Sequence, residues 1–124
     1  MAEQRGRIVL TIRREQMESL GEQMERRFVE RTVAHVRRYF AARCRELGDK
    51  GTREMVLYGV TRAKAHGFTA EADVSKYIDV MFAYGRDFDV APELPWASRI
   101  LEDPSLGNPE TRINALCDEA SLRQ

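Results

Sequence analysis

Residues 69–85 have the sequence TAEADVSKYIDVMFAYG, and this stretch decides the fold class. Its apolar side chains recur at the i, i+3, i+4, i+7 and i+8 spacing of a single helix face, which indicates an amphipathic helix. That face consists of Val74, Tyr77, Ile78, Met81 and Phe82. Thr69 is expected to cap the start of this helix and Gly85 its end. The stretch therefore predicts a helix that packs one side against a hydrophobic core.

Two further helices are predicted before this stretch. Over residues 13–47 apolar side chains return every three or four positions, which predicts one long helix that ends at Gly48. A second helix is expected over 53–66, with Thr52 as its N-cap. Gly59 lies on the apolar face of this second helix, so we expect a neighbouring helix to approach closely there.

The C-terminal end of the sequence predicts loops and shorter helices. Residues 86–95 read RDFDVAPELP, an acidic and proline-containing segment that is typical of a loop. A short helix should follow over 94–102, and a last helix should start at Pro109 with Asn108 as its N-cap. The fold class is therefore all-α: a helical bundle with one long N-terminal helix and short C-terminal helices.

The chain is expected to form one domain over residues 1–124, because either half would be too small for a core of its own. Residues 1–7 are polar and are predicted to be disordered. Residues 8–12 contain the strand-like run Ile8-Val9-Leu10, but no second strand is predicted for it to pair with. We therefore expect an extended arm laid on the helices.

The charges balance overall but not along the chain. The protein has 20 Lys and Arg and 20 Asp and Glu, yet residues 1–50 carry 12 basic and only eight acidic side chains. Arg and Glu alternate in this half, as in Glu22 with Arg26 and Arg27 with Glu30, which is typical of exposed ion pairs on a helix. We therefore favour a solvated helix face over a nucleic-acid surface, and predict no nucleic-acid partner.

The sequence contains no motif for catalysis, a metal or a cofactor. Cys44 and Cys117 belong to no CxxC pair, and His35 and His66 belong to no HExxH motif. We therefore predict a protein that is not an enzyme, has no cofactor and binds no metal, with two structural thiols and two unrelated histidines. The apolar runs are too short for a membrane span or a signal-peptide core, so we expect a cytoplasmic protein without a membrane partner.

Candidate partner-binding residues cluster around the end of the helix in 69–85. They are Tyr84, Arg86, Asp87, Phe88, Asp89 and Trp96. Aromatic and Arg side chains dominate binding hot spots, so a recognition site is one hypothesis, although a purely structural role is favoured. The structural alternative is a loop that Phe88 pins inward, in which Arg86 bonds Asp87 or Asp89. A third hypothesis is a small enzyme that uses Arg86, Asp87 and Asp89.

The segment YIDVMFAYGRDFD at residues 77–89 resembles a family of small, poorly characterised bacterial proteins. IRREQM at 12–17, LPWA at 94–97 and DPSL at 103–106 fit the same pattern, and the resemblance spans residues 8–119. Proteins of this kind are encoded beside spike-tip and toxin components of type VI secretion systems. The resemblance implies a chaperone or adaptor for an effector or a spike-tip component, or an immunity protein that neutralises a toxin in the cytoplasm.

Overall fold

The structure is a computed structural model, and it describes residues 25–124. The residues predicted to be disordered (1–7) or an extended arm (8–12) lie outside the described residues, as does the start of the predicted long helix. Within residues 25–124 the backbone forms five α-helices and one short 3-10 helix, and contains no strand. The prediction of an all-α fold is confirmed.

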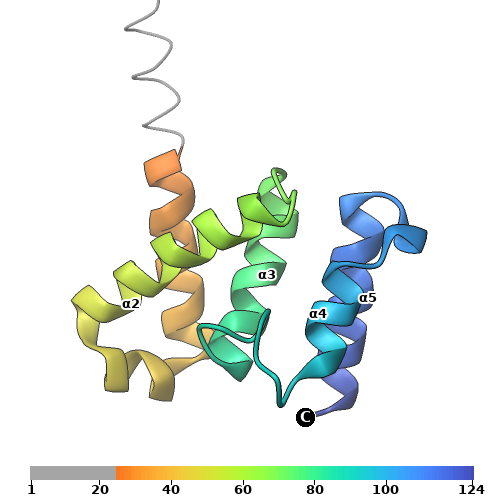
Figure 1. Ribbon diagram of the computed structural model, residues 1–124. Coiled ribbons are helices and arrows are strands. Elements are labelled where there is room, and N and C mark those ends of the chain that lie inside the picture. The colour runs from red at the N-terminus through yellow and green to blue at the C-terminus, as the bar shows by residue number, and fades with distance from the viewer. Residues whose placement is uncertain (1–24) are drawn as a thin grey trace, which may run out of the picture.

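The first described helix covers residues 25–39. It is followed by α2 (Ala41–Ala65), α3 (Glu71–Tyr84), α4 (Pro95–Leu101), the 3-10 helix η1 (Pro104–Leu106) and α5 (Pro109–Leu122). Helix α3 packs against α2 on one side and α5 on the other, while α4 packs against α5 (Figure 1). Helix α3 is therefore the central element of the bundle.

The predicted apolar face of α3 forms the middle of one hydrophobic core. Val74, Tyr77, Ile78, Met81 and Phe82 are all buried, with at most 3% of each residue exposed. Among the side chains expected opposite them, Phe28 and Val36 are also buried. Phe40 is only partly buried and packs on Phe82 with 5.9 Å between ring centroids.

The predicted long helix does not run unbroken to residue 47. The backbone leaves helical geometry at Phe40, and α2 begins at the next residue. The hydrogen-bond ladder continues across this break, because the N–H of Phe40 donates to the carbonyl of Val36 at 2.7 Å and that of Cys44 to the carbonyl of Phe40 at 3.0 Å. The break is therefore a tight bend between two helices, where the sequence pattern predicted one.

Helical geometry breaks at Gly48, where the sequence predicted that a helix ends, and a second helical stretch of α2 follows after the bend. The φ of 75° at Gly48 is costly for residues with a side chain, and helical backbone resumes directly afterwards. Thr52 consequently lies inside α2 and is not the N-cap that the sequence predicted. Its buried hydroxyl donates to the carbonyl oxygen of Cys44 at 3.4 Å, across the bend. The predicted end of this helix is confirmed, because α2 stops at Ala65.

The contact between α2 and α3 is as close at Gly59 as the sequence predicted. A Cβ atom placed on Gly59 would lie 2.7 Å from Met81 Cε and 2.8 Å from Ile78 Cγ1. Real Cβ atoms essentially never show contacts this short, so a larger residue at this position would force Met81 and Ile78 to shift. Gly59 thereby sets the distance at which α2 and α3 pack.

Two of the four predicted caps, Gly85 and Asn108, are confirmed, and those at Thr52 and Thr69 are not. Gly85 ends α3 with a φ of 118°, and Asn108 accepts a hydrogen bond from the N–H of Thr111 at 2.9 Å at the start of α5. Thr69 does not cap α3, because the N-cap residue is Ala70 and no side chain makes the capping bond. Glu71 and Asp73 lie in the first turn instead, where their negative charge is favourable beside the positive end of the helix dipole.

Candidate functional site

The loop after α3 folds back against α2 and separates the predicted site residues into buried and exposed ones. Its turns are closed by hydrogen bonds from the N–H of Phe88 to the carbonyl of Gly85 at 3.3 Å and from Val90 to Asp87 at 3.1 Å. Phe88 and Asp89 are buried, whereas Arg86 and Asp87 are exposed. The four residues from 86 to 89 thus face two different environments.

Asp89 lies in a buried polar cluster that the sequence analysis did not predict. Its side chain has no exposed surface, and its Oδ2 accepts a hydrogen bond from Arg62 Nε at 3.0 Å and a second from Arg62 Nη2. His66 Nε2 lies 2.9 Å from the same oxygen. The hydroxyl-bearing ring of Tyr77 packs beside His66, with 5.7 Å between the ring centroids. We call these four residues the Asp89 cluster.

The charges of the Asp89 cluster are set by burial and by hydrogen bonds. Burial alone would raise the pKa of Asp89, but the hydrogen bonds from His66 and Arg62 outweigh it and hold this pKa below its ordinary value. Burial, together with the nearby Asp89 charge, raises the pKa of Tyr77 far above its ordinary value. The cluster therefore contains an ionised carboxylate and a neutral phenol at neutral pH.

Two polar atoms of the Asp89 cluster have no hydrogen-bond partner among the described residues. They are the hydroxyl oxygen of Tyr77 and Oδ1 of Asp89, and both are fully buried. Unpaired polar atoms in a protein interior carry a desolvation cost. In the Asp89 carboxylate, Oδ2 is therefore paired with Arg62 and His66, whereas Oδ1 is unpaired.

The three aromatic candidates contribute to packing. Phe88 is 1% exposed and its ring lies 5.0 Å from that of Tyr77, so the prediction that it turns inward and pins the loop is confirmed. Trp96 is buried and meets the edge of the Tyr84 ring at 5.2 Å. The Tyr84 hydroxyl donates to the carbonyl of Ala120 at 2.6 Å, which joins α3 to α5.

The exposed part of the loop forms a small surface with α2. The guanidinium carbon of Arg86 lies 3.9 Å from the centroid of the Tyr58 ring, and the Tyr58 hydroxyl donates to Asp87 Oδ1 at 2.9 Å. The exposed fractions of Leu57 and Val90 are 46% and 64%. We call these five residues the outer platform.

The prediction that Arg86 bonds Asp87 or Asp89 is wrong. Each carboxylate binds a donor from α2 instead, and Arg86 stacks on an aromatic ring. The α2 donors follow the loop as one row, because Tyr58, Arg62 and His66 are spaced four residues apart and share a helix face. In the sequence these three residues form a polar row beside the apolar face of the helix. No feature of the neighbouring sequence indicates that this row contacts residues 86–89.

The two histidines each bind a carboxylate, which the sequence analysis also missed. His35 Nε2 lies 2.7 Å from Asp79 Oδ1, and both side chains are partly exposed. Burial raises the pKa of Asp79, although the hydrogen bond from His35 acts in the opposite direction. This pair joins the helix of residues 25–39 to α3.

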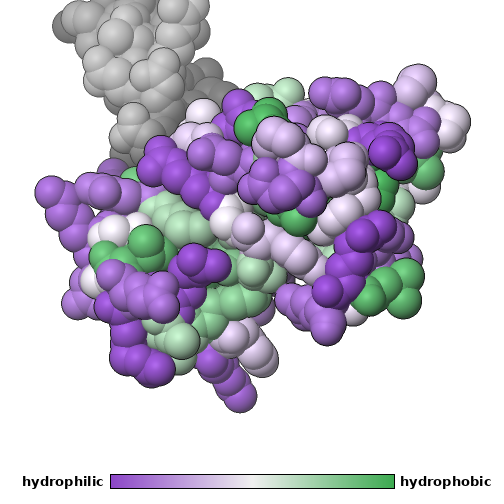
Figure 2. All heavy atoms as spheres, turned by 60° about the horizontal axis from the view of Figure 1, so that its bottom comes forward, coloured by the Kyte–Doolittle hydropathy of each residue, from purple (hydrophilic) through white to green (hydrophobic). Residues whose placement is uncertain are grey.

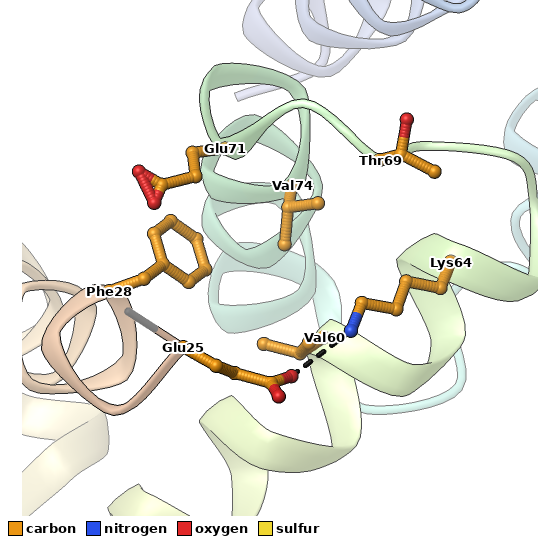
Figure 3. A pocket seen from close by; sticks show the side chains of 7 residues that line it. All are labelled: Glu25, Phe28, Val60, Lys64, Thr69, Glu71 and Val74. Atoms are coloured by element: carbon orange, nitrogen blue, oxygen red, sulfur yellow. Dashed lines mark hydrogen bonds and ion pairs between the residues drawn. The ribbon is translucent and has the colours of Figure 1, made fainter. Parts of the chain in front are cut away.

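A hollow of about 240 Å³ lies between the helix of residues 25–39, the end of α2 and the start of α3 (Figure 3). Its apolar side chains are Phe28, Val60 and Val74, and an ion pair of 3.0 Å between Lys64 Nζ and Glu25 Oε1 crosses it. None of the predicted site residues lines this hollow.

An apolar area lies at the end of the molecule where the helix of residues 25–39 bends into α2. Figure 2 looks toward this end and shows apolar side chains gathered on one part of it, within a hydrophilic surround. Two neighbouring hollows share Phe40, Ala83 and Gln124 in their linings. Exposed apolar surface of this kind is typical of contact with another macromolecule.

Comparison with known proteins assigns no family, because no protein-family model, curated protein or solved structure matches the chain. In residues 25–124 no three His, Cys, Asp or Glu side chains are grouped so that they could hold a metal ion. No helix in this part of the chain has the length and apolar character needed to cross a membrane. The fold and the site define a small helical protein in which one loop contributes both to an exposed platform and to a buried polar cluster, each completed by α2.

Proposed function

We propose that this protein is a non-enzymatic cytoplasmic accessory protein that binds another protein, as a chaperone or adaptor for a type VI secretion effector or spike-tip component. The resemblance of residues 77–89 and of the flanking motifs to proteins encoded beside such components supports the identity of the partner. The outer platform is the observation that carries the binding function. It presents exposed Arg86 stacked on Tyr58, and these are two of the residue types that dominate hot spots.

The geometry of the outer platform favours binding because Arg86, Tyr58 and Asp87 already contact one another. Ordering a flexible side chain at an interface costs about 0.5–1.5 kcal/mol. Stacking on Tyr58 reduces this cost for Arg86, and the hydrogen bond to Asp87 fixes Tyr58. The aliphatic side chains of Leu57 and Val90 add exposed apolar surface that a partner can cover.

The alternative of a small enzyme that uses Arg86, Asp87 and Asp89 receives no support from this geometry. A catalytic set must converge on one substrate. Arg86 stacks on Tyr58, Asp87 accepts the Tyr58 hydroxyl, and Asp89 is enclosed with Arg62 and His66. The three groups have separate surroundings, so we rank binding ahead of catalysis.

Co-purification tests the proposed function. Tagged protein, expressed from its native locus, should retain a product of a neighbouring gene through native purification. The Asp87→Ala variant should fold normally and retain less of it, because it releases Tyr58, while Glu54→Ala on the exposed side of α2 should retain as much as the wild type. Failure to retain any neighbouring gene product would contradict the proposal.

Co-expression separates an adaptor from the immunity alternative. Each neighbouring toxin gene is expressed in the cytoplasm of a susceptible host with or without this protein. An adaptor is expected to form a complex and leave toxicity unchanged. Rescue of growth would show that the protein neutralises the toxin, and would replace the adaptor role with immunity.

A further inference from the structure

Arg86 has a guanidinium group whose donors are free within the described part of the chain. The two carboxylates nearest in sequence already bind other groups, since Asp87 accepts the Tyr58 hydroxyl and Asp89 binds Arg62 and His66. Residues 25–124 offer Arg86 no hydrogen bond and no ion pair, only the ring of Tyr58. An exposed arginine in this situation can bind an acceptor from another molecule.

The guanidinium group of Arg86 lies over the ring of Tyr58. The Arg86 guanidinium carbon lies 3.9 Å from the Tyr58 centroid, and Tyr58 is in turn held by its 2.9 Å hydrogen bond to Asp87. The N–H groups of arginine lie in the plane of the guanidinium, so contact with a ring through one face leaves them available. Such a fork matches both oxygens of a carboxylate.

We propose that Arg86 binds an acidic side chain of the partner protein, and that apolar residues of the partner contact the exposed side chains of Leu57 and Val90. This inference rests on the proposed function and names the chemistry of the segment that the outer platform recognises. A carboxylate fits better than a phosphate, because Asp87 adds a negative charge to the same surface and repels a doubly charged group more strongly. The exposed aliphatic side chains suit a peptide and not a nucleic acid.

A pair of blocked tripeptides tests this recognition directly. The acetylated and amidated peptide leucyl-glutamyl-leucine is titrated into ¹⁵N-labelled protein, and leucyl-glutaminyl-leucine serves as its uncharged match. We expect the Nε–Hε resonance of Arg86 to shift with the glutamyl peptide and to stay in place with the glutaminyl one. Equal shifts with both peptides, or none with either, would overturn the inference.

Charge-preserving variants test whether the planar fork matters. Arg86→Lys retains the positive charge but loses the planar guanidinium group, which contacts the Tyr58 ring and offers two parallel N–H donors to a carboxylate. Binding of the glutamyl peptide should therefore weaken about fivefold. Arg45→Lys, at an exposed arginine in the first half of α2, should leave binding unchanged. Equal affinity of the Arg86→Lys variant and the wild type would contradict the assignment of the carboxylate to Arg86.

The outcomes also separate this inference from the proposed function. If a neighbouring gene product binds the wild type and the Arg86→Lys variant equally well, the protein is an adaptor but does not use Arg86. If the glutamyl peptide binds through Arg86 and no neighbouring gene product is retained, acid recognition stands and the proposed partner is wrong.

Discussion

Asp87 and Asp89 are two residues apart in one loop and have opposite surroundings. Asp87 is exposed and accepts one hydrogen bond from Tyr58, whereas the Asp89 side chain is enclosed with Arg62 and His66. A carboxylate can remain charged in a protein interior only when cations or donors replace the lost water. The difference shows that one short acidic segment both anchors itself to α2 and presents a charged surface to solvent.

The largest effect is expected from the buried aromatic side chain between the two carboxylates. Phe88→Ala should lower the free energy of unfolding by about 3–5 kcal/mol, because it opens a cavity beside Tyr77. Urea denaturation measures the change. Val90→Ala, two residues along at a position that is 64% exposed, is the matched control and should stay within about 0.5 kcal/mol of the wild type. Similar losses for both would mean that the loop is not divided into a buried and an exposed part.

The next largest effect should come from the cation that pairs with Asp89. Arg62→Met retains most of the aliphatic stem but leaves the buried carboxylate with His66 alone, and should cost about 3 kcal/mol. Arg53→Met on the same helix breaks the exposed ion pair with Glu30 and should barely change the urea midpoint. If the two variants were equally stable, the Asp89 cluster would not anchor the loop.

The dependence of stability on pH should distinguish the buried carboxylate from others. The pKa of Asp89 is lower in the folded than in the unfolded chain, so its contribution is fully present above the ordinary value of about 4 and is lost as the pH falls through the folded pKa. Asp89→Asn should therefore flatten the acid limb of the stability curve. The pKa of Asp79 is raised instead, so Asp79→Asn should steepen that limb. Denaturation midpoints between about pH 2 and pH 6 measure both slopes, and an unchanged slope for Asp89→Asn would count against the ionised cluster.

The smallest effect is expected from the unpaired hydroxyl of Tyr77. Tyr77→Phe removes a buried hydroxyl that makes no hydrogen bond of ordinary geometry, so stability should change by less than about 1 kcal/mol. Thermal unfolding at neutral pH is a suitable measurement. A clear loss of stability would show that the hydroxyl completes the Asp89 cluster through a bond, to the carboxylate or to a buried water.

The sequence predicted the helices that bury a continuous stripe and the break at Gly48, but it missed the bend at Phe40 and the direct restart of the helix after Gly48. The face of α3 was found because five apolar residues follow one period, and Gly59 was found because a glycine inside a stripe indicates close approach. The bend at Phe40 and the restart after Gly48 leave no gap in the apolar spacing, so periodicity could not reveal them. Tertiary packing decided these positions.

The sequence located the candidate site, but it did not predict which residues of α2 contact it. Residues 86–89 could be chosen because their composition changes abruptly after α3, and Phe88 could be oriented because an aromatic ring is costly in water. The partners Tyr58, Arg62 and His66 lie 23–29 residues away on another helix. Their pairing with the loop depends on the angle and distance at which α2 packs on α3, which a single sequence does not specify.

The central position of α3 has a consequence for how the molecule opens. Helix α2 rests on one side of α3 and α5 on the other, and α4 reaches the rest of the bundle mainly through α5. Helix α2 or α5 can therefore detach while α3 remains packed on its other neighbours, and the helix of residues 25–39 also contacts α3, so α3 is exposed only when all of them detach. Backbone amides of α3 should accordingly exchange with deuterium more slowly than those of α4, and α2 and α5 should exchange as separate units.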